Sequence, residues 1–288
     1  MSVPLKPPFT YFGGKNAIAD RIAGLLPPHE HYVEPFAGSL AVLFAKPRSR
    51  METVNDLDGE LMNFWRVLRE RPAELERVCA LTPHARAEHQ AAFSPAGDDL
   101  ERARCTWVKL TQGRSGFTTR RTGWRYYQDG RSSPSSMPEY LSAYVARLMP
   151  AARRLAGVSL ECKPALEVIS SYGQHETNLL YCDPPYLGSV RGWGNNYAVE
   201  MRSEDEHREL LEALIACKSA VVLSGYPSPL YDGMLDGWWR REIPTQTGNG
   251  GRDRARVEVV WSNRPFPQEF LFDLSAAGDG TRRSVRSA

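Results

Sequence analysis

The alternation of short apolar runs with amphipathic helix patterns limits the fold of this chain more than any other feature. A strand pattern at residues 31–36 leads through a small-residue turn to a helix at 40–45, and a second strand at 52–56 leads to a helix at 57–71. This order predicts an α/β sheet in which neighbouring strands run parallel. The pattern resumes after residue 157, with a helix at 204–217 and strands at 158–162, 178–182, 219–224, 238–243 and 255–263.

The segment 72–157 interrupts this pattern. It contains helical stretches near 72–93 and 99–112, a basic, glycine-containing stretch at 113–137 and a helix at 139–149. We therefore predict four parts of the chain. They are a first part of the sheet domain at 1–71, a mostly helical insertion at 72–157, a second part of the sheet domain at 158–274 and a disordered tail at 275–288.

Composition excludes several classes of protein. No run approaches the eighteen or so apolar residues that a membrane span needs, and the first fifteen residues lack the pattern of a signal peptide. The five cysteines form no CxxC pair and no zinc-type spacing with the six histidines. We therefore expect a reduced, cytoplasmic protein that binds no metal and no membrane.

Positive charge is concentrated in the insertion, although the formal net charge of the chain is only +2. Between Arg102 and Arg131 there are eight basic residues against one acid, with aromatic residues interleaved. Phosphate contact and base stacking require this mixture, and the alternative is a solvated loop with a few buried rings. The expected DNA contacts are Arg114, Phe117, Arg120, Arg121, Trp124 and Arg125.

An acid, two prolines and a tyrosine follow the strand expected at 178–182. Ligands of open α/β sheets bind beyond the carboxyl ends of the strands, where Asp183 would lie. Pro184 and Pro185 fix the backbone, so a carboxylate and a carbonyl aim two acceptors at one point. Their natural partner is an exocyclic NH₂ group, and Tyr186 offers a face on which its ring can stack. The alternative is a Pro-Pro turn with a half-buried tyrosine.

Four motifs together make the chain resemble a known family. They are 11-YFGGK-15, 33-VEPFAGS-39, 55-NDLDGELMNFW-65 and 181-YCDPPY-186, in this order. The chain resembles the Dam-type (D12 class) adenine-N6 DNA methyltransferases over roughly residues 7–265. The resemblance implies a Rossmann-like S-adenosylmethionine-dependent methyltransferase sheet with a mostly helical inserted target-recognition region.

The resemblance implies S-adenosyl-L-methionine as cofactor. Lys15 precedes a helix expected at 16–26, whose N-terminus attracts anions, and suits the carboxylate of the methionine part. Asp56 follows Glu34 by 22 positions, as acids that bind ribose hydroxyls do, and Asp58 is the alternative ligand. The expected cofactor residues are Tyr11, Lys15, Glu34, Phe36, Gly38, Asp56 and Asp183.

Two of these motifs depart from the family's pattern. Tyr11 stands where relatives often have tryptophan, and Ala37 and Leu40 flank a lone Gly38 where relatives often have two glycines. The detail of this wall of the cofactor site is therefore left open.

The implied reaction is methyl transfer to the N6 amine of adenine in a specific sequence of double-stranded DNA, with base flipping. The expected catalytic residues are Asp183, Pro184, Pro185 and Tyr186. The loop 187–197 either closes over the flipped base or makes no specific contact, and His207 is expected to be structural. The target sequence cannot be carried over from the family. The simplest assembly for such a reaction is a monomer.

Other readings compete with this one. An N4-cytosine methyltransferase usually has serine at the position of Asp183, and protein glutamine methylation would prefer asparagine there. A DNA-binding relative that has lost activity stays open. A C5-cytosine methyltransferase needs a Pro-Cys pair, an NAD enzyme a GxGxxG and an NTPase a GxxxxGK[ST] motif, and the chain has none of the three.

Overall fold

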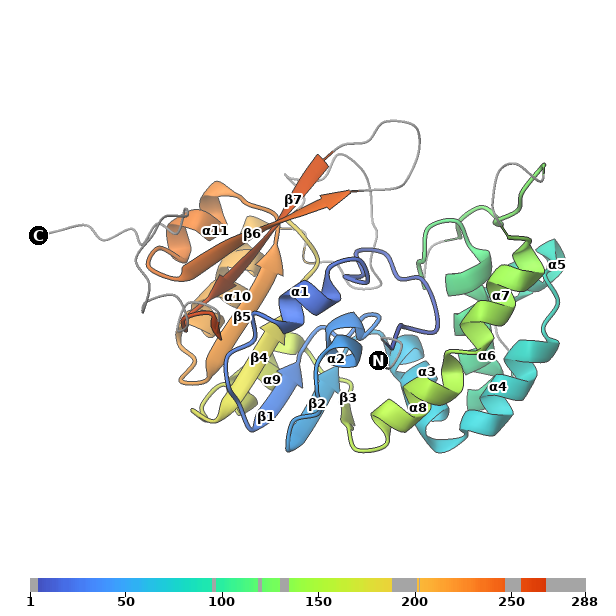
Figure 1. Ribbon diagram of the computed structural model, residues 1–288, viewed down its shortest axis with the longest axis horizontal. Helices are drawn as coiled ribbons and strands as arrows, with labels where there is room; N and C mark the ends of the chain where they lie inside the picture. Colours follow the sequence, from blue (N-terminus) through green and yellow to red (C-terminus); the bar gives the residue numbers. More distant parts are fainter. Residues whose placement is uncertain are drawn as a thin grey trace, which may run out of the picture.

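The computed structural model describes residues 5–94, 97–118, 121–129, 135–187, 201, 203–246 and 255–267. Within these ranges seven strands form one sheet with the order β3-β2-β1-β4-β5-β7-β6 (Figure 1). The strands are β1 (His31–Glu34), β2 (Met51–Asn55), β3 (Ser159–Glu161), β4 (Asn178–Cys182), β5 (Ala220–Gly225), β6 (Trp239–Gln246) and β7 (Ala255–Ser262).

The first five strands run parallel, and the last two form an antiparallel hairpin at one edge. β1 pairs in parallel with both β2 and β4, so the order of the strands reverses between β1 and β4. β7 pairs antiparallel with β5 and with β6. This is a Rossmann-like sheet, and the point of reversal is where open α/β sheets bind ligands. The α/β class predicted from the alternating pattern is confirmed.

Both faces of the central strands are buried, which explains the apolar runs in β4 and β5. Successive residues of a strand point to opposite faces, so Tyr32 lies in one hydrophobic cluster and Val33 in the other. In β4, Leu179 and Tyr181 face the first cluster, whereas Leu180 faces the second.

Each face is covered by its own set of helices (Figure 1). Those in the first cluster with the sheet are α1 (Ala19–Ala23), α2 (Ala41–Ala45) and α3 (Gly59–Glu70). Those in the second cluster are α9 (Ala165–Tyr172), α10 (Glu204–Ile215) and α11 (Pro229–Met234).

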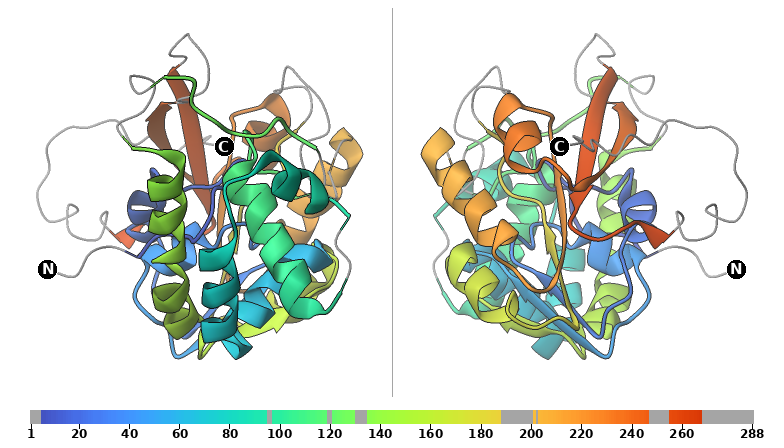
Figure 2. Two further views of the ribbon diagram at one scale, coloured as in Figure 1. Left: turned by 90° about the vertical axis from the view of Figure 1, so that its right-hand side faces the viewer. Right: turned by 90° about the vertical axis from the view of Figure 1, so that its left-hand side faces the viewer.

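Five helices of the insertion gather beyond the β3 edge of the sheet, as Figures 1 and 2 show. They are α4 (Pro72–Leu81), α5 (Arg86–Ala91), α6 (Asp99–Gln112), α7 (Met137–Val145) and α8 (Leu148–Leu155). Their buried side chains, among them Trp107 and Leu148, belong to the same cluster as Tyr32 of β1. The described part of the insertion therefore shares its core with one face of the sheet.

The N-terminal segment 7–12 lies between the sheet and the insertion. Phe9 is fully buried, with its ring centroid 5.0 Å from that of Trp65. Trp107 donates its indole N–H to the carbonyl of Pro8 over 3.0 Å, and the amide of Phe12 donates to the carbonyl of Gly116 over 3.0 Å. This segment ties the loop that carries Lys15 to the basic stretch of the insertion.

Most of the expected elements are present, and the differences have local causes. The helix expected at 16–26 is only α1, because Gly24 ends it and Pro27 and Pro28 follow. The stretch 72–93 is broken at Pro83. The helix expected at 139–149 is divided into α7 and α8, since Pro150 cannot donate to the carbonyl of residue 146.

Some expectations lie outside the described residues. These are the tail 275–288, most of the loop 187–197 and Arg120. None of the described helices is long and apolar enough to cross a membrane, and in the same ranges no group of three potential metal ligands is found.

Candidate active site

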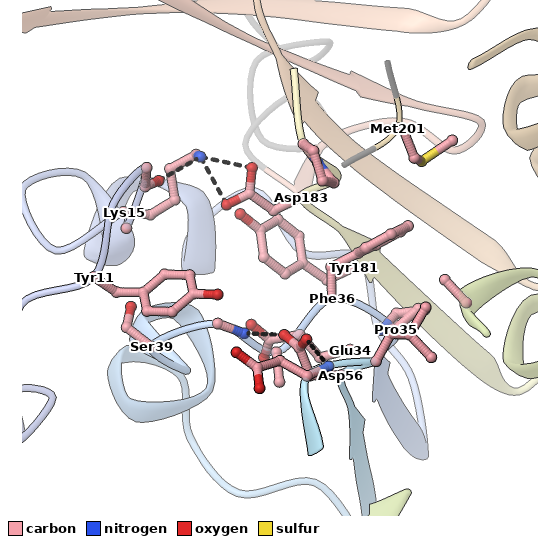
Figure 3. Close-up of a pocket in the computed structure, with 18 of the residues that line it drawn as sticks. Tyr11, Lys15, Glu34, Pro35, Phe36, Ser39, Asp56, Tyr181, Asp183 and Met201 are labelled. Carbon is pink, nitrogen blue, oxygen red and sulfur yellow. Dashed lines mark hydrogen bonds and ion pairs between the residues drawn. The ribbon is translucent and has the colours of Figure 1, made fainter. Parts of the chain in front are cut away.

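A cavity of about 250 Å³ opens at the carboxyl ends of β1 and β4, where the strand order reverses (Figure 3). Its walls come from residues within 11–15, 34–42, 56–58, 164–166 and 181–185, together with Met201 and three residues of α10. All seven residues expected to hold the cofactor are among them. The fold therefore gathers motifs that are far apart in the sequence, such as 11-YFGGK-15 and 181-YCDPPY-186, around one space.

The turn after β1 brings the backbone close to the cavity. Gly38 has a φ of +47°, and a Cβ atom there would lie 3.1 Å from the ring of Tyr11. Leu40 has a φ of +56°, which costs a residue with a side chain about 1 kcal/mol. Its side chain is fully buried, and that burial offsets the cost. Leu40 thus adopts a conformation that glycine favours, so the turn keeps its shape with a lone glycine.

Asp56 and Asp58 follow β2, and both line the cavity. Each oxygen of Asp56 accepts one backbone N–H, from Gly38 and from Asp58, over 3.0 Å. Burial raises the pKa of Asp56 to about 6 despite these hydrogen bonds. Asp56 stays partly exposed to the cavity, so it is the better placed of the two acids for a ligand hydroxyl.

Asp58 is engaged elsewhere. One oxygen caps α3 by accepting the amides of Glu60 and Leu61, and the other accepts the hydroxyl of Thr118 over 2.6 Å. The residue is only 8% exposed. Asp58 therefore joins the start of α3 to the insertion.

Glu34 ends β1 at the base of the cavity and is 3% exposed. Burial raises the pKa of Glu34 well above its usual range, against a hydrogen bond from the hydroxyl of Tyr32 that lowers it. The nearby charge of Asp183 raises it further. The raised pKa favours the protonated form of Glu34.

Lys15 and Asp183 point toward each other and are in direct contact at the wall of the cavity, as Figure 3 shows. The ammonium of Lys15 lies 2.6 and 2.7 Å from the two oxygens of Asp183, and it also donates to the hydroxyl of Tyr186 over 2.5 Å. α1 begins only at Ala19, so Lys15 is held by these partners instead of standing at the start of a helix. Desolvation by burial lowers the pKa of Lys15, but Asp183 and a second acid outweigh it and raise that pKa above its usual range.

That second acid is Glu258 of β7, which the sequence analysis did not single out. Its carboxylate accepts the hydroxyl of Tyr186 over 2.9 Å and lies 3.5 Å from the ammonium of Lys15. Glu258 is 4% exposed. The available signal was an acid within the apolar run 255–263, because a charged side chain at a buried position of a strand needs a partner.

Apolar side chains line part of the cavity, and sequence reasoning missed them as well. Leu57, Pro164, Ala165, Leu166, Met201 and Leu210 contribute to its walls. None of them is charged, and only Leu57 lies in one of the four motifs. Ala165 and Leu166 are brought here by α9, and Leu210 by α10. An aromatic ring can bind against such a surface.

The residues expected to contact DNA are distributed unevenly. Gly113 and Trp124 form an isolated antiparallel bridge, so the two arms of this basic stretch lie together. Arg114 and Arg121 are exposed, and Trp124 is partly exposed. Phe117 is buried and its ring lies 4.6 Å from that of Phe12, which makes it part of the packing between the insertion and the N-terminal segment.

Trp124 is the centre of a stacked group that also includes residues not singled out beforehand. Its ring lies nearly parallel to those of His84 and Tyr126, at centroid distances of 4.3 and 5.4 Å. The guanidinium of Arg86 lies 4.9 Å from the Trp124 ring, and that of Arg114 lies 5.5 Å from the Tyr126 ring. We call these five residues the aromatic-arginine stack. By contrast, Arg125 is partly buried and donates to the hydroxyl of Tyr140.

The strand order defines the class of this protein as one with a Rossmann-like sheet, and the cavity lies at the carboxyl edge where such sheets bind their ligands. Within that class, residues 11–99 match the model of the D12 class N6 adenine-specific DNA methyltransferases. The family resemblance expected from the four motifs is confirmed, and the matched family is a family of enzymes.

Two curated relatives agree with this family. The chain is 26% identical over 210 residues to the DNA N-6-adenine-methyltransferase of Escherichia phage P1, a match that covers 69% of this chain and 27% of the phage protein. It is 36% identical over 81 residues to the Type II methyltransferase M1.LlaDCHI of Lactococcus lactis subsp. cremoris, covering 27% of this chain and 28% of that protein. The matches thus span less than a third of either relative.

Solved structures similar to this fold include a SAM-dependent methyltransferase from Agrobacterium tumefaciens, with 10% identity, a TM-score of 0.38, and coverage of 86% of this chain and 60% of that chain. An rRNA methylase from Streptococcus thermophilus has 8% identity, a TM-score of 0.37, and coverage of 86% and 96%. TM-scores this low carry no conclusion about function, and the fold class rests on the strand order itself.

Proposed function

We propose that this protein transfers a methyl group from S-adenosyl-L-methionine to the N6 amine of adenine in a specific sequence of double-stranded DNA. The observation that carries the proposal is the position of Asp183 in the wall of the cavity, beside the acid and glycine turn that suit the cofactor, with Tyr186 hydrogen-bonded to the same lysine as Asp183. The matched family and both relatives support the same chemistry.

The cavity suits a cationic nucleoside. Lys15 is opposed by two acids, Asp183 and Glu258, and Asp56 adds a third on the opposite wall. The charge balance of the described residues around the cavity is therefore negative when these acids are ionised, which favours a sulfonium over a neutral ligand. Asp56 would accept the ribose hydroxyls, and Gly38 lets the backbone approach the ligand. Leu57 and residues 164–166 would hold the adenine ring of the cofactor.

Within this site the bound cofactor would supply a methyl group on a sulfonium sulfur, which keeps the bonding electron pair and leaves as a neutral thioether. Asp183 and the carbonyl of Pro184 would accept the two hydrogens of the target amine and so localise its lone pair on nitrogen. That lone pair forms the new C–N bond, and the nitrogen becomes cationic. Asp183 would take one proton from it and pass it to solvent.

Tyr186 and the aromatic-arginine stack would hold the DNA. Tyr186 offers a ring beside Asp183, on which a flipped adenine can stack. The stack presents Arg86 and Arg114 at the surface of the insertion, on the side of the basic stretch, where they can contact phosphates. The monomeric state and the cytoplasmic location of the protein stay predictions.

The test is methyl transfer from labelled S-adenosylmethionine to unmethylated genomic DNA, followed by nucleoside analysis. We expect label in N6-methyladenine, and Asp183→Ala should lower the rate by at least about a hundredfold because the amine loses its acceptor. The urea unfolding midpoint of the variant serves as the control for folding. Label in N4-methylcytosine would show that the target base is cytosine instead of adenine. Cofactor binding without any label on DNA would contradict the proposal.

A further inference from the structure

Lys15 occupies the place on Asp183 that the target amine has to take. It lies within 2.7 Å of both carboxylate oxygens, so the amine cannot approach Asp183 while Lys15 keeps this position. A paired ammonium also makes a carboxylate a weaker proton acceptor and places a positive charge beside a nitrogen that is becoming cationic. The proposed reaction therefore requires Lys15 to withdraw from Asp183.

Glu258 is placed to accept that charge. It lies 3.5 Å from the ammonium of Lys15 and is buried within β7. A buried ammonium that left Asp183 without a second partner would carry a large desolvation cost. With Glu258 present, Lys15 can exchange one carboxylate for another over a short distance.

Tyr186 links this exchange to the incoming base. Its hydroxyl accepts from Lys15 over 2.5 Å and donates to Glu258 over 2.9 Å, so it bridges the cation and the acid. The ammonium of Lys15 also lies 4.9 Å from the centre of the Tyr186 ring. Any shift of this ring when a base stacks on it would change its contacts with both Lys15 and Glu258.

On these contacts, and resting on the proposed function, we infer that Glu258 is a positioning residue of the methyl transfer. It holds the hydroxyl of Tyr186 and takes over the charge of Lys15 when the target amine replaces Lys15 on Asp183. Burial raises the pKa of Glu258, the charge of Lys15 lowers it and the charge of Asp183 raises it, so Glu258 responds to both members of the ion pair.

The experiment compares kcat and KM of Glu258→Gln with those of the wild type in the same methylation assay. Glutamine keeps the shape and accepts from Tyr186 but carries no charge. We expect kcat to fall by about 10- to 100-fold, the range for groups that act through a reacting residue, with little change in KM for either substrate. Glu242→Gln is the matched control, because Glu242 is an exposed acid on the neighbouring strand β6.

A double mutant tests whether Glu258 acts through Lys15. The Lys15→Met variant has no lysine charge for Glu258 to accept, so adding Glu258→Gln to this variant should lower its kcat no further. Glu258→Asp keeps the charge and should retain most of the wild-type kcat. It also provides the test of the inference if Glu258→Gln lowers the unfolding midpoint.

Three outcomes would overturn the inference. The first is a kcat of Glu258→Gln equal to that of the wild type, and the second is a kcat of Glu258→Asp lower than that of Glu258→Gln. The third is that Glu258→Gln lowers kcat by the same factor in the wild type and in Lys15→Met. If the wild-type protein methylates no DNA, both the proposed function and this inference fail. If the wild type is active and one of the three outcomes is observed, only this inference fails.

Discussion

Asp56 binds two backbone amides with two oxygens, one from the turn after β1 and one from the start of α3. Both oxygens are required, since an amide side chain has only one acceptor oxygen and would turn a donor toward a backbone N–H. The carboxylate thus fixes the turn around Gly38 while it faces the cavity. Its charge and its geometry are both part of the cofactor site that we propose.

Cofactor affinity should depend on pH through Asp56. The pKa of Asp56 in the folded protein is about 6, so its carboxylate is lost as the pH falls through this value. We expect the cofactor Kd, measured by calorimetry between pH 5 and 8, to rise below about pH 6. Asp56→Asn should bind about tenfold or more weakly at pH 7, or about 1.4 kcal/mol, and should lose this pH dependence. An unchanged profile in the variant would assign the effect to another group.

Folding stability responds to the same group with the opposite sign. Because the folded pKa of Asp56 is raised above its ordinary value, the protonated acid favours the folded state. This contribution is fully present below the ordinary pKa near 4 and is lost as the pH rises through about 6. Acid conditions therefore weaken cofactor binding through Asp56 without weakening the fold through it.

From the sequence alone, the site residues that can be predicted are those that lie next to the end of a strand. Asp183 and Asp56 each come directly after a strand, and sheet geometry places such strand ends together. Glu258 lies inside a strand, and its closeness to Lys15 depends on β7 pairing next to β5, which no local pattern reveals. Leu166 carries no charge and lies in none of the four motifs, so no sequence signal marks it.

α3 is the element that joins the cofactor wall to the insertion. Its N-cap, Asp58, also accepts the hydroxyl of Thr118, which lies within the basic stretch. A shift of this stretch would therefore pull on the same turn that holds Asp56. The start of α3 is a physical connection between the proposed DNA and cofactor sites.

Removing this connection should lower stability measurably. Thr118→Val leaves a buried oxygen of Asp58 without its partner, and we expect a loss of about 1–3 kcal/mol in the free energy of unfolding. Asp58→Ala removes the cap as well, which by itself costs about 0.5–2 kcal/mol. Urea unfolding measures both, with Thr177→Val as the control at an exposed threonine. A Thr118→Val protein as stable as this control would show that the hydrogen bond contributes nothing.

Element boundaries could be predicted where the chain carries its own signals. β1 and β4 were recognisable because both faces of the sheet are covered and their residues are uniformly buried. The division between α7 and α8 was not foreseen, although Pro150 marks it, because the apolar positions continue through the break. The extent of β6 to Gln246 depends on its partner β7 and has no signal of its own.

At the scale of the whole molecule, the insertion contributes to the core and to the charged surface at once. Its buried side chains pack against the sheet, while Arg86, Arg114 and Arg121 are exposed. Arg86 comes from α5 and Arg114 from the basic stretch, yet both guanidinium groups lie over the ring of Tyr126. Distant segments thus form one cationic surface, which composition alone could only locate to a region.

Affinity for DNA should depend on this surface and on salt. Replacing Arg86 and Arg114 by glutamine removes two cations without removing the aromatic rings. The slope of log Kd against log salt should fall by about 0.9 for each phosphate that is no longer neutralised, while the Kd of the cofactor stays unchanged. Arg50→Gln is the control, because Arg50 is exposed just before β2, at the other end of the strands from the cavity. Equal salt slopes in all three proteins would exclude the stack from phosphate binding.

The N-terminal segment has a consequence for how the protein is made. Residues 7–10 leave the ribosome well before their hydrogen-bond partners Trp107, Leu110 and Arg147, which lie 99, 100 and 140 positions later in the chain. β1 likewise pairs with β4, which is translated much later. Phe9 is fully buried in the folded protein. In the nascent chain its ring therefore lacks its folded packing partners until these later residues have been translated. The N-terminal segment can therefore make its full set of folded contacts only after Arg147 has been translated.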